Sequence, residues 1–288
     1  MFFTISLVLI AAGLITIGVN AGRGNGAFAY SLEFQGGTST NVTFDKDYSI
    51  DEIDKEIVPV VEKVTGDNNV QTQKVAGTNQ VIIKTVTLDL DKREALNKAM
   101  VDNFGVDESK ITAENISSTV SNEMRRDAVI AVVIATICML LYIWFRFKDI
   151  RFATSAVLAL LHDVLVVIGF YAIARISVGN TFIACMLTIV GYSINATIVI
   201  FDRIREEMRG KTKSSDVAAV VNKSITQTLT RSIYTSLTTF IMVAVLYVMG
   251  VSSIKEFALP LMVGVVCGAY SSVCITGALW YVMKRFKK

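Results

Sequence analysis

A histidine and an aspartate, His162-Asp163, stand side by side in the middle of a long apolar run. They lie about 11 to 12 residues from the flanking cations Arg151 and Arg175, so a helix rising about 1.5 Å per residue would carry them deep into a hydrocarbon layer. A carboxylate at that depth is costly and needs a partner or a task. Two interpretations are open: ion coupling or a conformational latch, and a purely structural hydrogen bond between helices.

The two side chains are not expected to serve each other. Neighbours on a helix point about 100° apart, and residues at i and i+1 do not face each other. We therefore predict that His162 and Asp163 do not form a pair with each other.

Three further apolar runs carry polar or small residues at helical spacing. In chain order the sets are Thr188, Gly191, Asn195 and Asp202; Thr228, Arg231, Thr235 and Thr238; and Gly264, Gly268, Ser272 and Thr276. The Gly264-x-x-x-Gly268 spacing permits close approach of two helices. Arg231 stands near the end of its run, where a long side chain can also simply anchor a helix. Together with Asp163, the stripes predict a helix bundle with a polar interior.

Other chemistries find little support. Gly191-Tyr192-Ser193 with His162 is a weak match to a serine-hydrolase turn, and no orienting motif accompanies it. No GxxxxGK[ST] segment for nucleotide phosphates is present. The cysteines all lie in apolar runs, which favours buried thiols over a disulfide or metal site: Cys138, Cys185, Cys267 and Cys274. We expect no enzyme activity, no cofactor and no metal, and any energy must come from an ion gradient or a partner.

The elements that position these residues are membrane helices. Of 288 residues, 52% are hydrophobic and 18% charged, against about 25% charged in a soluble domain. Runs of about 20 apolar residues predict transmembrane helices, and six are present: Phe2–Val19, Ala128–Phe145, Phe152–Ala174, Thr181–Phe201, Leu229–Val251 and Phe257–Met283. The net charge of +3 comes without a basic stripe and interleaved aromatic residues, so nucleic acid is not an expected partner.

Lysine and arginine gather in alternate loops, which sets the orientation. Basic residues are abundant after the second and fourth predicted helices and in the C-terminal tail. The loops after the third and fifth predicted helices carry mainly Arg175 and Lys255. Both termini are therefore predicted in the cytoplasm. The basic residues are Arg146, Lys148, Arg151, Arg203, Arg205, Arg209, Lys211, Lys213, Lys223, Lys284, Arg285, Lys287 and Lys288.

The first apolar run is predicted to be a retained helix. Ala27-Phe28-Ala29 has the small-x-small pattern of a cleavage site, but no Lys or Arg precedes the run, which is longer than a usual signal-peptide core. The missing basic residues leave open that the natural chain begins earlier, for example as the second half of a fusion.

Residues 21–124 alternate between strand and helix patterns. Strands are expected at Thr40–Phe44, Val70–Val75, Gln80–Thr87 and Ile111–Val120, and helices at Asp51–Thr65 and Asp91–Phe104. Asp91 is expected to cap the second helix, and residues 76–79 to turn the hairpin. The order βαββαβ predicts a ferredoxin-like domain. We expect three parts: a transmembrane helix at 1–20, an extracytoplasmic α+β ferredoxin-like domain at 21–124, and a five-helix transmembrane domain at 125–288 with a cytoplasmic loop at about 202–224.

Several long motifs stand in order along nearly the whole chain. They are E-F-Q-G-G-T at 33–38, F-R-F at 145–147, L-L-H-D-V at 160–164, G-Y-S-I-N at 191–195, F-D-R-I-R-E at 201–206, N-x-S-x-T-Q-T-L-x-R at 222–231, T-S-L-T-T at 235–239 and Y-S-S at 270–272. Together they resemble the SecF subunits of the bacterial SecD/SecF protein-export family, which is related to RND transporters. Gly36, Gly37 and Thr38 match the family's extracytoplasmic glycine motif.

The resemblance implies a polytopic, RND-like helical fold and an accessory role in protein translocation across the bacterial cytoplasmic membrane, driven by an ion gradient. The implied partners are a SecD-like subunit, the SecYEG translocon, a translocating unfolded polypeptide and membrane lipid. Six residues are predicted in the ion-coupling or polar membrane core: His162, Asp163, Asn195, Asp202, Arg231 and Thr235. Three glycines are predicted to pack helices: Gly191, Gly264 and Gly268.

One position departs from the family pattern. The family usually has Asp after the signature Asn195, and here the residue is Ala196, which cannot titrate. The resemblance implies that this Asp and Arg231 are coupling residues, so Arg231 lacks its expected partner, and a buried unpaired cation is costly. Three hypotheses are open: Asp163 takes over the role, a carboxylate of the SecD partner pairs with Arg231, or the subunit is uncoupled. We favour the second.

Two other functions compete with ion-coupled export. A small RND-type exporter of lipid or drug would use the same helices, but it needs an outer cavity for which a domain of roughly 90 residues looks small. A non-coupled scaffold that only stabilises the translocon is compatible with Ala196.

Overall fold

The computed structural model describes residues 2–23, 26–67, 70–75, 77–147, 149–209, 216–250 and 252–285. Several residues of the sequence-based predictions lie outside these ranges: Ala76, Lys148, Lys211, Lys213, Val251, Lys287 and Lys288. The chain divides into two compact units. Met1–Ala29 with Val129–Lys288 is called the helix bundle here, and Tyr30–Ala128 the small domain.

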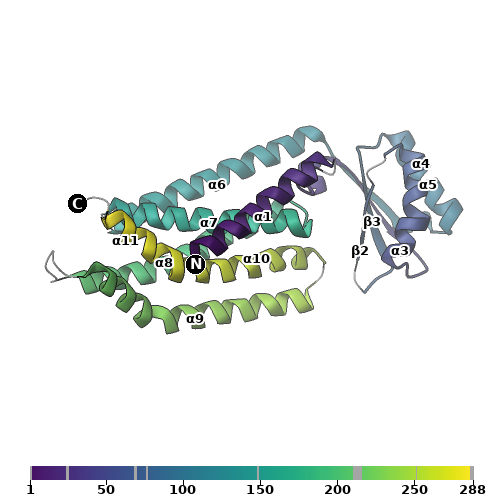
Figure 1. The fold of residues 1–288 in the computed structure, drawn as a ribbon. Coiled ribbons are helices and arrows are strands. Elements are labelled where there is room, and N and C mark those ends of the chain that lie inside the picture. The colour runs from purple at the N-terminus through teal and green to yellow at the C-terminus, as the bar shows by residue number, and fades with distance from the viewer. Residues whose placement is uncertain are drawn as a thin grey trace. The chain divides into compact units, whose positions relative to one another are not determined.

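Six helices in the described ranges are long and apolar enough to cross a membrane (Figure 1). They are α1 (Phe2–Gly22), α6 (Ser118–Phe147), α7 (Ile150–Ala174), α8 (Asn180–Met208), α9 (Val217–Met249) and the continuous run of α10 (Ser252–Ser271), η3 (Ser272–Thr276) and α11 (Gly277–Arg285). All six predicted spans are confirmed. Large apolar side chains such as Phe145 and Met249 are about four-fifths exposed, at 78% and 81%, as expected of helices that face lipid.

Helix α7 is the central element of the bundle, because it packs against α1, α8 and α10 (Figure 1). Helix α7 crosses α1 at close range, since a Cβ added to Gly13 would meet the Cα of Gly169 at 2.6 Å. Helix α10 also contacts α8 and α9. Small residues at such crossings let backbones approach closely in a membrane, where the hydrophobic effect does not drive association.

Aromatic rings pack one end of the bundle. Phe152 of α7 stacks on Trp280 of α11 with ring centroids 4.8 Å apart. It also meets the ring of Phe201 of α8 edge-on at 4.6 Å. All three side chains are buried, so the ends of α7, α8 and α11 are fixed against one another.

The described part of the small domain forms a four-stranded antiparallel sheet in the order β2-β3-β1-β4. Its elements are α2 (Leu32–Gln35), β1 (Gly37–Thr43), α3 (Ile50–Glu52), η1 (Ile53–Ile57), α4 (Val58–Thr65), β2 (Gln71–Lys74), β3 (Gln80–Thr85), α5 (Leu90–Phe104), η2 (Glu108–Lys110) and β4 (Ile111–Ile116). Side chains such as Val42, Ile83 and Leu96 form its core. The predicted fold class, a helical membrane protein with a ferredoxin-like domain, is confirmed.

Three local predictions need correction. The cap of α5 is Asp89, whose side chain accepts the Lys92 N–H at 2.9 Å, and Asp91 lies inside the helix. The last strand ends at Ile116, because the Ser117 hydroxyl accepts the Val120 N–H at 3.4 Å and α6 begins at Ser118. The helix expected over 51–65 contains the π-helical turn η1 in its middle.

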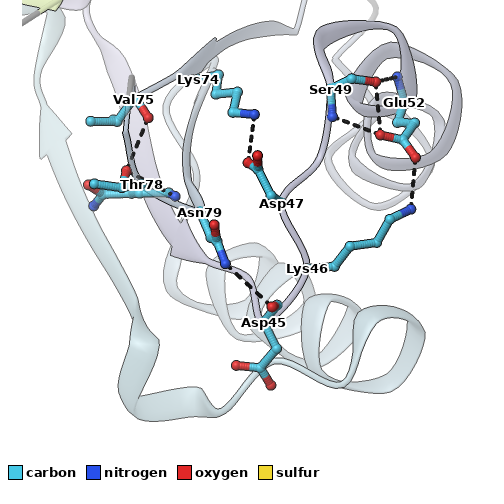
Figure 2. A network of polar contacts seen from close by, with 10 residues as sticks. Asp45, Lys46, Asp47, Ser49, Glu52, Lys74, Val75, Thr78 and Asn79 are labelled. Atoms are coloured by element: carbon cyan, nitrogen blue, oxygen red, sulfur yellow. Dashed lines mark hydrogen bonds and ion pairs between the residues drawn. The ribbon is translucent and has the colours of Figure 1, made fainter.

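A polar network fixes the segment between β1 and α3 (Figure 2). Ser49 and Glu52 form a reciprocal capping box, in which Glu52 accepts the Ser49 N–H at 2.8 Å. Lys46 donates to Glu52 at 2.8 Å, and this bond, followed by the bonds from Ser49, lowers the pKa of Glu52 to about 2. Two contacts tie the segment to the β2–β3 hairpin: Lys74 with Asp47 at 2.6 Å, and Asn79 with the Asp45 carbonyl at 3.3 Å.

Candidate ion site inside the helix bundle

Asp163 of α7 is a fully buried carboxylate at the junction of three helices. Its Oδ2 accepts hydrogen bonds from the Ser193 hydroxyl of α8 at 2.6 Å and the Ser271 hydroxyl of α10 at 2.7 Å. Its Oδ1 contacts Nδ1 of His162 at 2.9 Å. Through these two bonds the carboxyl group joins α7 to α8 and α10.

The contact between His162 and Asp163 contradicts the sequence-based prediction that the two do not pair. Adjacent Cα–Cβ bonds do diverge, but Nδ1 lies near the base of the imidazole ring, and the short Asp163 side chain turns back to meet it at 2.9 Å. The other ring nitrogen, Nε2, is buried and has no hydrogen-bond partner in the described part of the chain. The Tyr270 ring lies beside the imidazole, with centroids 6.2 Å apart.

A second layer of hydroxyl groups joins α8 to the last helix. Thr197 and Ser272, both buried, lie 3.3 Å apart through their hydroxyl oxygens. Ser272 donates to the Gly268 carbonyl at 2.6 Å. A Cβ added to Gly268 would meet the Ser193 Cβ at 3.3 Å, so the glycine lets the helices come close enough for these hydroxyls to meet.

The helix that carries Ser271 changes its winding immediately after that residue. Residues Ser272–Thr276 form the π-helical turn η3, and the Thr276 hydroxyl donates to the Ser271 carbonyl at 3.1 Å. Single π-turns inside α-helices are frequent at functional sites. Here the π-helical turn begins directly after Ser271, which donates a hydrogen bond to the buried carboxyl group of Asp163.

Three other predicted site residues lie on a different, exposed surface of the bundle. Asn195 of α8 and Arg231 and Thr235 of α9 are exposed and line a hollow of about 110 Å³. Ala196 lines the same hollow. A bond from Tyr192 to Ser236, at 2.8 Å, bridges α8 and α9 beside it.

Arg231 has no ion pair among the described residues. Asp202 lies seven residues beyond Asn195 on α8. Its carboxylate pairs with Arg146 of α6 at 2.9 Å and not with Arg231. A second hollow, of about 460 Å³, has Arg231 and Val199 in common with the first and extends to Asp202 and Glu206. Arg231 thus stands where the two hollows meet. The predicted residues therefore fall into three places: the buried pair, the exposed hollow, and the Asp202–Arg146 ion pair.

The predicted packing glycines differ in their surroundings. A Cβ added to Gly264 would meet Ile189 Cδ1 of α8 at 2.3 Å. A Cβ on Gly191 would meet no atom within 4 Å, and Gly191 is exposed. Gly264 and Gly268 thus lie at the α8–α10 contact, whereas Gly191 lies on the same exposed surface as Asn195.

The glycine motif of the small domain fixes its backbone. Gly37 has φ of +137°, and a Cβ there would meet the Thr85 carbonyl oxygen at 2.3 Å, so the position excludes other residues. Thr38 is fully buried, donates to the Asn115 side chain and accepts the Leu88 N–H at 2.8 Å. Gly36 lines a polar hollow of about 290 Å³ with Asp67 and Lys84 among others.

The two serines that donate to the buried carboxyl group, Ser193 and Ser271, were not predicted as site residues. Ser271 was considered only as part of a family motif, and Ser193 only as part of a family motif and of a weak serine-hydrolase match. Serine in an apolar run is common and has no characteristic spacing. A usable signal did exist, because Ser271 precedes Ser272 of the small-residue stripe, and Ser193 lies two residues before Asn195. The Gly13–Gly169 crossing was missed because Gly169 is the single glycine of α7 and Gly13 lies five residues from Gly18, so neither belongs to a four-residue glycine repeat.

Six membrane helices, three of which meet at a buried, hydrogen-bonded carboxylate, together with a ferredoxin-like domain, define a multi-pass membrane protein. A family model described as "Protein export membrane protein SecD/SecF, C-terminal" matches residues 96–286. Protein translocase subunit SecF of Sebaldella termitidis is 38% identical over 91% of this chain and 84% of the relative. SecF of Petrotoga mobilis is 35% identical over 100% of this chain and 95% of the relative.

A solved structure agrees with these relatives. The crystal structure of SecDF from Thermus thermophilus, described as a translocon-associated membrane protein, superposes with a TM-score of 0.81 at 30% identity. It covers 99% of this chain, and this chain spans 38% of that longer chain. The chain belongs to the SecD/SecF family of protein-export membrane proteins, and within it to the SecF branch.

Proposed function

We propose that this chain is a SecF subunit that works with a SecD-like subunit and the SecYEG translocon to promote export of unfolded polypeptides, using an ion gradient. The observation that carries the proposal is similarity along the whole length: the chain covers 84% and 95% of two proteins named as protein translocase subunits. No catalytic step belongs to the proposal, because the work is movement of a polypeptide driven by an ion and by partners.

The proposed setting is the bacterial cytoplasmic membrane, with both termini in the cytoplasm and the ferredoxin-like domain outside. The distribution of basic side chains supports this orientation, since positive residues concentrate in cytoplasmic loops. The ends of α6, α8 and α11 carry Arg146, Arg203, Arg205 and Arg285, whereas the loop between α7 and α8 carries Arg175 alone.

The proposed contact with the SecD-like subunit is the exposed surface of α8 and α9 around Arg231. A cation on a membrane-spanning helix needs a counter-charge or access to water, and no carboxylate among the described residues supplies the charge. The hollow of about 110 Å³ beside Ala196 leaves space for a carboxylate from a neighbouring helix. Relatives named SecDF, of which this chain spans 25% in Bacillus subtilis and 38% in Thermus thermophilus, support a SecD-like partner.

The ion-coupling part of the proposal is supported by the buried carboxylate of Asp163. Ionisable groups inside membrane helices commonly mark ion or proton pathways. Asp163 is also the ligand that joins α7, α8 and α10, so a change in its charge or its donors acts on three helices at once.

A non-coupled scaffold is the second candidate, and Ala196 is the observation that favours it. In that case the subunit stabilises the export machinery, and all ion coupling occurs in the partner. The exposed surface of α8 and α9 would then serve assembly alone.

Export into inverted membrane vesicles tests the proposal. Vesicles depleted of this subunit are restored with wild type, Arg231→Ala or the control Thr154→Ala, an exposed position whose hydroxyl bonds to its own helix at Ile150. Export of a Sec-dependent substrate is then measured with and without an ion gradient. Restoration by wild type with loss of gradient-dependent export in Arg231→Ala supports a coupled subunit. If wild type and Arg231→Ala give equal gradient-dependent export, and depleted vesicles export less than restored ones, the non-coupled scaffold is supported. No deficit on depletion contradicts both.

A further inference from the structure

One atom of the buried site has hydrogen-bonding capacity that nothing in the described chain uses. His162 is only 9% exposed, and its Nε2 is buried without a partner. Its Nδ1 faces Asp163 Oδ1 at 2.9 Å, where it donates, since an ionised carboxylate only accepts. In the neutral imidazole, Nε2 then carries an unshared electron pair. A buried polar atom without a partner calls for an explanation.

The charge of the site points to what Nε2 binds. Asp163 accepts three hydrogen bonds, but none comes from a residue with a permanent positive charge. With neutral imidazole, the pair therefore carries one negative charge inside a membrane-spanning bundle, which is costly. Addition of a proton to Nε2 turns the pair into an imidazolium and a carboxylate in direct contact, with no net charge.

The carboxylate is the less suitable place for that proton. Oδ2 already accepts from the Ser193 and Ser271 hydroxyls, and Oδ1 from His162. A proton on Oδ2 would displace one of the two serine donors, and a proton on Oδ1 would remove the negative charge that strengthens all three bonds. A proton on Nε2 leaves the carboxylate ionised and displaces no donor.

The elements packed on α7 bring no competing cation to the pair. Helix α10 contributes Cys267 and Tyr270, α8 contributes Tyr192 next to Ser193, and α1 has no titratable residue over Phe2–Gly22. The charged residues of these helices stand near their ends: Asp202, Arg203, Arg205, Glu206 and Glu207 in α8, Lys255 and Glu256 in α10, and Lys284 and Arg285 in α11. The nearest of them along α8 is nine residues from Ser193, about 13 Å.

We propose that the His162–Asp163 pair is a proton-binding site, in which Nε2 of His162 takes the proton and Asp163 is the fixed counter-charge. The inference rests on the proposed ion-coupled function and deepens it, because it names the ion and the atom. It also assigns the titrating role to α7, in a chain where Ala196 cannot titrate.

Proton binding at this atom has a structural consequence. An adjacent imidazolium competes with the Ser193 and Ser271 hydroxyls for the charge of Asp163, and electrostatic competition is strong in a medium of low dielectric constant. The two bonds that hold α8 and α10 to α7 weaken as a result. The π-helical turn that follows Ser271 gives α10 a place to change its winding.

The experiment uses the fact that His162 is the single histidine of the sequence. The full-length chain, without a polyhistidine tag, is labelled with ¹⁵N at histidine, reconstituted in lipid nanodiscs, and its two ring-nitrogen signals are followed by NMR from about pH 9 to about pH 4. We expect proton-bearing Nδ1 throughout, and proton uptake at Nε2 in one step as the pH falls. A proton on Nε2 and none on Nδ1 at high pH, or no uptake in the range, would overturn the inference.

Two variants test the role of the counter-charge. Asp163→Asn is expected to reduce the ratio of imidazolium to neutral imidazole at a given pH by at least about tenfold, as loss of an adjacent charge does. Ser193→Ala, which removes a competing donor, is expected to increase that ratio and serves also if Asp163→Asn fails to fold. An unchanged ratio in either folded variant overturns the role of Asp163. The NMR experiment requires neither SecD nor a translocon, so it fails or succeeds independently of the vesicle export assay.

Discussion

Ser193 of α8 and Ser271 of α10 donate to the same oxygen atom of Asp163, at 2.6 and 2.7 Å. Both hydroxyl groups belong to fully buried or nearly fully buried residues. One carboxylate oxygen therefore joins two helices that have no charged group at this depth, and the stability of the bundle should depend on both serines.

Removal of these donors is expected to destabilise the bundle. Each hydrogen bond to a charged group contributes about 1.5–3 kcal/mol, so Ser193→Ala and Ser271→Ala should each lower the midpoint of thermal unfolding in detergent. Thr188→Ala is the matched control on α8, since its exposed hydroxyl bonds only to the carbonyl of its own helix at Ala184. Equal midpoints for Ser193→Ala and Thr188→Ala would contradict the assigned role.

A methyl group added at Gly264 is expected to destabilise the α8–α10 contact. A Cβ there would come within 2.3 Å of Ile189 Cδ1, and overpacking of this kind costs about 1–3 kcal/mol. Gly264→Ala should lower the thermal midpoint, and Ile189→Val in the same chain should restore part of the loss. Gly191→Ala, with open space around the new Cβ, should be neutral or stabilising. A loss at Gly191 equal to that at Gly264 would show that the loss at Gly264 is not due to overpacking against Ile189.

A carboxylate introduced at position 196 is expected to form an ion pair with Arg231. Both residues line the same hollow of about 110 Å³, and no carboxylate in the described chain pairs with this arginine. Ala196→Asp should therefore stabilise the isolated subunit relative to Ala196→Asn. A double-mutant cycle with Arg231→Ala measures the coupling, which is expected to be favourable. A coupling of zero would mean that position 196 and Arg231 do not meet.

The capping box of the small domain should respond to acid. The pKa of Glu52 is lowered from an ordinary 4.5 to about 2, first by Lys46 and then by Ser49. A lowered folded-state pKa contributes stability above the unfolded value, and this contribution disappears as the pH falls toward 2. Amide exchange of residues 45–57 should be faster in Glu52→Gln than in wild type at about pH 6, with the ratio of rates approaching one at about pH 2. A ratio that does not change with pH would contradict this assignment.

The sequence predicted the larger architecture because its signals are long. Six apolar runs and a βαββαβ order each rest on many residues, so single errors cancel. Helix ends depend on single side chains, and there the predictions failed: Asp89, not Asp91, caps α5, and Ser117 starts α6 early. In both places another short polar residue lies within two positions along the chain, Asp91 after Asp89 and Ser118 after Ser117, so the sequence alone does not select which residue caps the helix.

The candidate site was predictable only in part, for a similar reason. Asp163 stood out because a carboxylate in an apolar run is costly wherever it points. The serines that donate hydrogen bonds to it lie 30 and 108 residues away in sequence, and only the packing of α7, α8 and α10 brings them together. The pairing of His162 with Asp163 was predicted wrongly, since the rule for neighbouring helical residues describes Cβ directions and not the reach of an imidazole ring.

The central claim, that this chain couples an ion gradient to export through its buried carboxylate, is tested most directly by Asp163→Asn. Export of a Sec-dependent substrate is measured in inverted vesicles with and without a proton gradient. The control is Thr154→Ala, an exposed position of α7 whose hydroxyl bonds only to its own helix at Ile150. We expect that Asp163→Asn, present at the wild-type level, abolishes gradient-dependent export while Thr154→Ala retains it. Full gradient-dependent export in Asp163→Asn would contradict the claim.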